Sequence, residues 1–151
     1  MITLERTNSG NKNFVRLVES LDEDLRRRDK NEHSYYAQFN KIDKLKYVVV
    51  AFENEQPVGC GAIKEYNRDT MEIKRMFVSP EFRGKGIATK ILFELENWAK
   101  ELNFSHCILE TGKKQPEAIG LYKKNGYNII PNYDQYKGME NSICFEKIVS
   151  F

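Results

Sequence analysis

One stretch decides the fold: MFVSPEFRGKGIA at residues 76–88. It begins with the apolar residues of a buried strand, and Pro80 ends that strand because proline cannot donate to a sheet ladder. A short loop follows, with Arg83, Lys85 and two glycines. An amphipathic helix then starts, with apolar residues three and four apart from Ile87 onward. A strand, a glycine-rich basic loop and a helix in this order predict an anion site at the helix N-terminus.

The chemistry of this loop favours a phosphate ligand. Gly84 and Gly86 have no Cβ, so their backbone can approach a ligand closely. The first N–H groups of the helix have no partner inside it, and the helix dipole favours an anion there. Arg83 and Lys85 add positive charge, and we therefore expect a pyrophosphate cradle. The loop lacks the Walker A spacing, and the dinucleotide-binding pattern would need glycine or alanine at position 89, which is threonine.

The rest of the chain predicts a mixed α/β fold. Apolar spacing predicts helices over Asn13–Lys30, Gly84–Leu102 and Pro116–Asn125. We expect strands over Ile2–Arg6, Tyr47–Phe52, Val58–Tyr66, Thr70–Val78, Ser105–Glu110, Tyr127–Ile130 and Ser142–Val149. The segment His33–Leu45 could be a short helix or an ordered loop, and Glu53–Pro57 should be a turn. This order predicts a sheet that is antiparallel up to Val78 and parallel where the long helix crosses over.

The composition excludes several classes of function. The 151 residues are 40% hydrophobic and 30% charged, which is typical of a globular domain. Their net charge of +2 is too small for a nucleic-acid or membrane surface, and the charged run at residues 22–28 predicts a solvated helix face. No apolar run is long enough to span a membrane and no signal sequence is evident, so we expect a cytoplasmic protein. Cys60, Cys107 and Cys144 lack zinc-site spacing and should be buried thiols.

Two motifs resemble those of the GNAT superfamily of acyl-CoA N-acyltransferases. Arg83–Ala88 fits the superfamily pattern Arg/Gln-x-x-Gly-x-Gly/Ala. The segment QPEAIGLYKKNGY at residues 115–127 is similar to the pattern Asn-x-x-Ala-x-x-Leu-Tyr-x-x-x-Gly-Phe. Gln115 replaces the common asparagine of this pattern, and Tyr127 replaces the common phenylalanine. The two motifs occur in the order of the superfamily, whereas the first 45 residues carry little of the resemblance.

The resemblance implies a fold and an activity. The fold is a single domain, residues 1–151, with an α/β (α+β mixed) architecture: a central mixed, mostly antiparallel sheet of six to seven strands, helices on both faces, and a splay between the fourth and fifth strands. The activity is direct transfer of an acetyl group from acetyl-CoA, as co-substrate, to a primary amine of a small molecule, without a metal. A protein N-terminus or lysine as acceptor is an alternative, and so is an acyl-CoA-binding sensor or inactive subunit. No nucleic-acid or membrane partner is expected, while the final strand could pair across a homodimer.

The resemblance also implies roles for individual residues. The N–H of Met76 would be the oxyanion donor, and Tyr122 would donate to the departing thiolate. Glu72 would be the general base, with a backbone-held water as an alternative and Glu110 as a second carboxylate. The expected cofactor-binding residues are Met76, Phe77, Val78, Arg83, Gly84, Lys85, Gly86, Ile87, Ala88, Thr89, Gln115 and Tyr122.

The acceptor side has fewer markers in the sequence. Lys74 and Arg75 should point to opposite faces of their strand because side chains alternate. One of the two could then reach the acceptor. The architecture of the superfamily places the early helices and the loop before the last strand over the acceptor. The tyrosines in those segments could line the acceptor pocket or simply pack, and they are Tyr35, Tyr36, Tyr133 and Tyr136.

Overall fold

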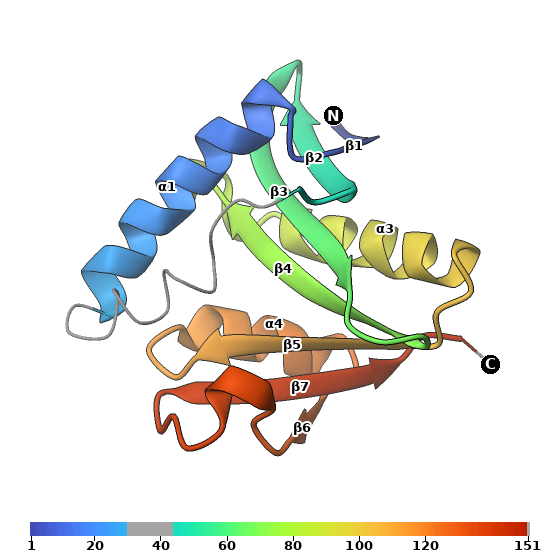
Figure 1. The fold of residues 1–151 in the computed structure, drawn as a ribbon. Coiled ribbons are helices and arrows are strands. Elements are labelled where there is room, and N and C mark those ends of the chain that lie inside the picture. The colour runs from blue at the N-terminus through green and yellow to red at the C-terminus, as the bar shows by residue number, and fades with distance from the viewer. Residues whose placement is uncertain (30–43, 151) are drawn as a thin grey trace. The chain divides into compact units, whose positions relative to one another are not determined.

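The computed structural model describes residues 1–29 and 44–150. The helices are α1 (Lys12–Asp29), α3 (Ile87–Glu101) and α4 (Pro116–Lys124), with short 3-10 helices η1 (Pro80–Phe82) and η2 (Asp134–Tyr136). The strands are β1 (Ile2–Thr7), β2 (Tyr47–Glu53), β3 (Gln56–Glu65), β4 (Thr70–Val78), β5 (His106–Gly112), β6 (Asn128–Ile130) and β7 (Ser142–Ile148), as Figure 1 shows. No helix in the described ranges combines the length and apolar composition that a bilayer span requires. Most of the segment expected as a short helix or loop, residues 33–43, lies outside the described residues.

The strands form a sheet with the hydrogen-bonded order β1-β2-β3-β4-β5-β7-β6. The β1–β2, β2–β3, β5–β7 and β6–β7 pairs are antiparallel, whereas β4 and β5 are parallel. The expected mixed, mostly antiparallel sheet is therefore confirmed. The first hairpin turn is tighter than predicted, because β3 already begins at Gln56 and only Asn54 and Glu55, with φ of 48° and 73°, form the turn. Positive φ at both central residues matches the natural twist of the two strands.

The chain divides into two compact units. The first contains Met1–Lys64 and Ile73–Leu95, and the second contains Glu65–Glu72 and Glu96–Phe151. Strand β4 contributes to both units, since its division falls between Glu72 and Ile73. Its parallel pairing with β5 runs from Thr70 opposite His106 to Glu72 opposite Ile108, within the second unit.

In the first unit, helices cover both faces of the strands. Helix α1 packs its apolar side on β2, β3 and β4 (Figure 1). The buried residues of this cluster are Phe14, Leu17, Val18, Leu21, Leu45, Val48, Val50, Cys60, Ala62 and Phe77. Helix α3 takes the opposite face, where a Cβ added to Gly59 or Gly61 would lie 3.0 Å or 2.9 Å from the side chain of Ile91. These two glycines therefore allow α3 to approach β3 closely.

The second unit is held by a buried carboxylate. The side chain of Glu96, at the C-terminal part of α3, is 6% exposed. It accepts a hydrogen bond from the Tyr127 hydroxyl at 2.7 Å and from the Lys147 ammonium at 2.9 Å. Burial of a carboxylate is costly unless its oxygens are paired. Here the pairing joins α3 to the residue before β6 and to β7.

A second buried ion pair joins α1 to β4 within the first unit. The Arg75 side chain is 2% exposed, and its Nη1 donates to Asp22 Oδ1 at 3.0 Å. Nη2 has no hydrogen-bond partner among the described residues. The backbone of Arg75 is left-handed, with φ of 60°, and its carbonyl accepts from the Cys60 thiol at 3.3 Å. The solvated face predicted for residues 22–28 therefore has a second role at Asp22, whose partly exposed carboxylate compensates a buried charge.

The three cysteines are buried and unpaired, as predicted. Burial raises the pKa of the Cys60 and Cys107 thiols to about 12 and that of Cys144 to about 11. These groups therefore remain neutral thiols at physiological pH.

Removing the charge of Asp22 should destabilise the fold. We expect Asp22→Asn to lower the free energy of unfolding by about 1–3 kcal/mol, because Arg75 would remain buried without its counter-charge. The loss stays below that of a fully buried pair, since the Asp22 side chain is 41% exposed and solvent screens it. Urea denaturation followed by circular dichroism measures the effect. Glu19→Gln, an exposed position on the same helix, is the control and should change the free energy by less than about 0.5 kcal/mol; equal losses in the two variants would contradict the role of the pair.

Candidate active site

The loop between β4 and α3 has the geometry of an anion cradle. Gly84 and Gly86 have φ of 80° and 79°, a backbone conformation that favours glycine. A Cβ at either position would meet no atom within 4 Å, so the backbone faces open space. The N–H of Lys90 donates to the Gly86 carbonyl at 3.2 Å and closes the first turn of α3. The preceding helical N–H groups, from Ile87 to Thr89, therefore have no acceptor within the helix.

This geometry corrects one boundary. The sequence predicts a helix from Gly84, whereas α3 begins at Ile87. The left-handed backbone of Gly84 and Gly86 keeps residues 84–86 outside the helix, so their backbone N–H groups can bind a ligand. The Ile87 side chain is 1% exposed and belongs to the core, which leaves its backbone for the predicted cofactor contact.

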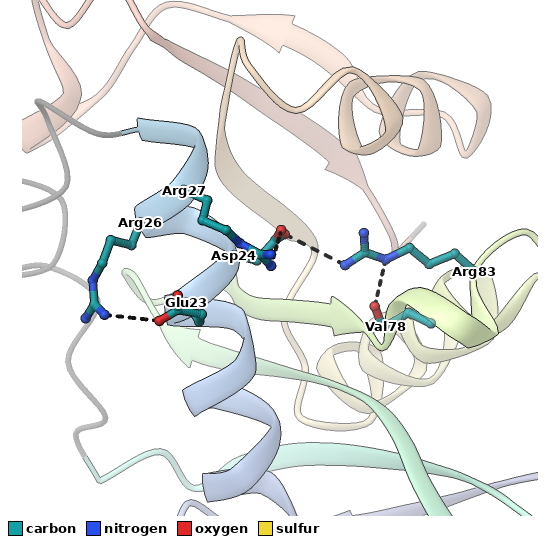
Figure 2. A network of polar contacts seen from close by, with 6 residues as sticks. All are labelled: Glu23, Asp24, Arg26, Arg27, Val78 and Arg83. Atoms are coloured by element: carbon teal, nitrogen blue, oxygen red, sulfur yellow. Dashed lines mark hydrogen bonds and ion pairs between the residues drawn. The ribbon is translucent and has the colours of Figure 1, made fainter.

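Arg83 has a structural role in addition to any role at the cradle. Its Nε donates to the Val78 carbonyl at 2.8 Å, and its Nη2 lies 3.7 Å from Asp24 Oδ2 (Figure 2). Asp24 also pairs with Arg27 at 3.6 Å. The guanidinium therefore links the end of β4 to α1 across the first unit. Lys85 is exposed on the loop, with its ammonium 5.2 Å from the centre of the Phe82 ring.

The strand before the loop is largely buried. Phe77 and Val78 are 6% and 8% exposed, whereas Met76 is half-buried. Phe77 packs in the α1 cluster, and the Val78 carbonyl already accepts from Arg83. Met76, Phe77 and Val78 stay predicted cofactor-binding residues, and a ligand that used the Val78 carbonyl would share it with Arg83.

In the second unit, Glu72 lies against tyrosines from the end of β3 and from the loop between β6 and β7. Its Oε2 accepts a hydrogen bond of 2.7 Å from the Tyr133 hydroxyl. The Tyr133 ring makes edge contacts with Tyr66, at 5.4 Å between centroids, and with Tyr136, at 5.5 Å. We call Tyr66, Tyr133 and Tyr136 the tyrosine cluster. Burial, followed by the neighbouring Glu72 charge, raises the pKa of Tyr133 far above its ordinary value.

Tyr122, the expected thiolate partner, is on α4 and 5% exposed. Its ring contacts Tyr127 and Phe145, with centroid distances of 5.7 Å and 5.8 Å. Burial, and secondarily the charge of Glu110, raises the pKa of Tyr122. The phenol is therefore a neutral hydrogen-bond donor at physiological pH.

Gln115 starts α4 through its backbone. Its N–H donates to the Gly112 carbonyl at 3.0 Å, and its own carbonyl accepts from Ala118 at 3.1 Å. The side chain makes no capping bond. Its expected cofactor contact stays a prediction.

The sequence interpretation missed Tyr66, Asp22 and Asp24. Tyr66 follows the last residue of β3, and no pattern distinguishes it from other strand-end tyrosines. The two aspartates lie in a charged run that also contains the exposed Glu23–Arg26 pair. Nothing in that run indicates that their own partners are Arg75 on β4 and Arg83 after it. Within the described ranges, no group of three His, Cys, Asp or Glu side chains could hold a metal ion.

Comparisons with known proteins agree on one family. Residues 14–127 match the model of the acetyltransferase (GNAT) family. The IAA acetyltransferase of Azospirillum brasilense is 33% identical over 149 residues, which are 97% of each chain. A crystal structure from Klebsiella pneumoniae, assigned as an acyl-CoA N-acyltransferase, is similar with a TM-score of 0.82 and 26% identity over 99% of this chain and 98% of that one. The PaiA N-acetyltransferase of Thermoplasma acidophilum, solved with coenzyme A, has the same fold, with a TM-score of 0.73 and 17% identity over 98% and 99% of the two chains.

The Tyr133 hydroxyl should resist ionisation. Because its pKa is raised well above the ordinary value of about 10, we expect no phenolate from it up to about pH 11. Ultraviolet titration of the wild type and of Tyr133→Phe should then count the same number of phenolates up to that pH, with circular dichroism confirming the fold. One additional phenolate in the wild type would contradict this. A raised pKa in the folded state also means that its contribution to stability is complete below about pH 10 and is lost as the pH rises further.

Proposed function

Since the chain belongs to the GNAT acetyltransferase family and is an N-acetyltransferase, we propose that it moves the acetyl group of acetyl-CoA to a primary amine of a small molecule, by direct transfer in a ternary complex. The observation that carries this proposal is the loop from Arg83 to Ala88. Its two left-handed glycines face open space immediately before the N-terminus of α3. This arrangement suits a pyrophosphate, which is negatively charged and accepts hydrogen bonds from backbone N–H groups.

The residues of the loop fit coenzyme A in charge and in donors. The N–H groups of residues 84–89 would bind the pyrophosphate oxygens, and the exposed Lys85 would add a positive charge. The Arg83 side chain would keep the loop attached to β4 and α1, while its backbone takes part in the cradle. When bound, acetyl-CoA supplies a thioester whose acetyl carbon an amine can attack.

The acceptor must lose a proton before or during its attack. Glu72 is the proposed general base and would take this proton from the ammonium group. The new bond joins the amine nitrogen to the acetyl carbon, and the carbon–sulfur bond then breaks. The Met76 N–H would donate to the carbonyl oxygen while that oxygen carries negative charge.

Tyr122 would stabilise the leaving thiolate as a hydrogen-bond donor. Its pKa is raised above its ordinary value of about 10, whereas a thiol has a pKa of about 8.5. Complete transfer of the phenol proton to the thiolate would therefore be uphill. A donated hydrogen bond needs no such transfer and still lowers the energy of the departing sulfur.

The small-molecule acceptor is supported by the surroundings of Glu72. The carboxylate is half-buried and bonded to Tyr133, which is itself packed between two aromatic rings. Such a setting suits a small amine better than a protein segment. A screen of small amines beside N-terminal and lysine peptides would decide between the acceptor classes, and binding of acetyl-CoA without acetylation of any amine would favour the sensor alternative.

A negative charge introduced at Gly86 should weaken cofactor binding. We expect the wild type to bind acetyl-CoA with a micromolar dissociation constant in calorimetric titration, and Gly86→Glu to weaken binding by at least about tenfold, because a carboxylate would oppose the pyrophosphate. Gly138→Glu is a matched control: Gly138 has φ of 77° and no atom within 4 Å of an added Cβ, so it carries the same strain and charge. Equal binding by the two variants would move the cofactor site away from the loop.

The two proposed catalytic side chains should affect turnover rather than cofactor affinity. We expect kcat to fall about 100-fold in Glu72→Gln and about tenfold in Tyr122→Phe, because each loses an interaction used in the transition state. Steady-state kinetics and calorimetry with acetyl-CoA measure both effects, with the exposed Glu65→Gln as control. Wild-type turnover in Glu72→Gln would favour a water held by backbone carbonyls as the base.

A further inference from the structure

The contact between Tyr133 and Glu72 joins residues that are 61 positions apart. Its O···O distance of 2.7 Å is typical of a hydroxyl that donates to an ionised carboxylate, which is among the stronger hydrogen bonds in proteins. Both residues belong to the second unit, Glu72 on β4 and Tyr133 in the loop between β6 and β7.

The loop that carries Tyr133 is held by the preceding residue. The Asn132 side-chain amide Nδ2 lies 3.1 Å from each of three carbonyl oxygens, those of Tyr136, Met139 and Ser142. The Tyr133 carbonyl itself accepts from the Tyr136 N–H at 2.9 Å. The backbone of Tyr133 is therefore fixed on both sides, and this limits where its hydroxyl can lie.

Two aromatic neighbours fix the Tyr133 ring. Tyr66 meets it at an interplanar angle of 71°, and Tyr136 meets it at 90°. Edge-to-face contacts of this kind are directional and stabilise a defined ring orientation. With backbone and ring both held, the hydroxyl is directed at Glu72 Oε2 without further ordering.

We propose that Tyr133 is a positioning residue for Glu72: its hydroxyl holds the carboxylate in one orientation, ready to take a proton from the acceptor amine. This inference rests on the proposed function, in which Glu72 is the general base. Tyr133 keeps its own proton throughout the reaction, which agrees with the raised pKa of its phenol. It therefore acts through Glu72 and is not itself an acid in the reaction.

Other groups face the same carboxylate, and none of them competes with it as a charged group near neutral pH. Tyr66 from the end of β3, Tyr136 from η2 and Cys144 from β7 all interact electrostatically with Glu72. The pKa of each is raised by burial and by nearby carboxylates, so all three stay neutral around pH 7.

The test is Tyr133→Phe, which removes the hydroxyl and keeps the ring. We expect kcat to fall about tenfold and the KM for acetyl-CoA to stay within about twofold, because the carboxylate loses the donor that holds it in position for proton transfer. In the Glu72→Gln background, the same substitution should have no further effect on kcat, since it acts through that carboxylate.

Tyr127→Phe is a matched control. It removes a tyrosine–glutamate hydrogen bond of the same 2.7 Å length, to Glu96, in the same unit. We expect it to lower stability while leaving kcat near the wild-type value. A loss of kcat in Tyr133→Phe no larger than that of Tyr127→Phe, or a further loss of kcat when Tyr133→Phe is added to Glu72→Gln, would show a merely structural hydroxyl and overturn the proposal.

The Glu72→Gln variant separates the two possible failures. If it keeps wild-type turnover, the base assignment in the proposed function fails and the positioning role fails with it. If Glu72→Gln loses turnover while Tyr133→Phe behaves as the wild type, only the positioning role fails.

Discussion

Strand β4 carries two charged side chains into the protein, and each requires a partner from far along the chain. Arg75 is paired with Asp22 of α1, 53 residues away, and Glu72 is bonded to Tyr133, 61 residues away. An uncompensated buried charge costs several kcal/mol, so these contacts constrain where α1 and the loop between β6 and β7 can lie against their own parts of β4. The strand thus organises each unit through one charged side chain, an ion pair at Arg75 and a hydrogen bond from a neutral hydroxyl at Glu72, as well as through hydrogen bonding in the sheet.

In the loop between β4 and α3, the basic side chain of Arg83 and the backbone of the glycines have different roles. Arg83 uses its side chain to hold the end of β4 and α1 together, whereas the glycines supply exposed backbone. A basic residue beside glycines therefore need not direct its charge at a ligand. Backbone N–H groups fixed by left-handed glycines require little reorganisation when an anion binds. A long lysine side chain loses more conformational entropy on binding, so it contributes less to affinity.

Local features of the fold could be predicted from the sequence because they depend on local pattern. The bounds of β4, Thr70–Val78, follow from its apolar run and from Pro80. The sequence predicts a start of α3 at Gly84, before its actual start at Ile87, because apolar spacing carries no information about the left-handed backbone of a glycine. The Glu72–Tyr133 and Arg75–Asp22 contacts could not be predicted, since a pair of residues so far apart leaves no periodic signal. The left-handed backbone of Arg75 also has no sequence marker, because it is not at a glycine.

The buried cysteines have a practical consequence for measuring the reaction. Disulfide-exchange chromogens react with thiolates, and Cys60, Cys107 and Cys144 are both inaccessible and, with pKa values of about 12, 12 and 11, almost wholly protonated near neutral pH. Such a reagent would therefore react mainly with the thiol of the coenzyme A that acetyl transfer releases. Colour in a sample of enzyme alone would then report unfolded chains, so the same cuvette would serve as an activity assay and as a gauge of structural integrity.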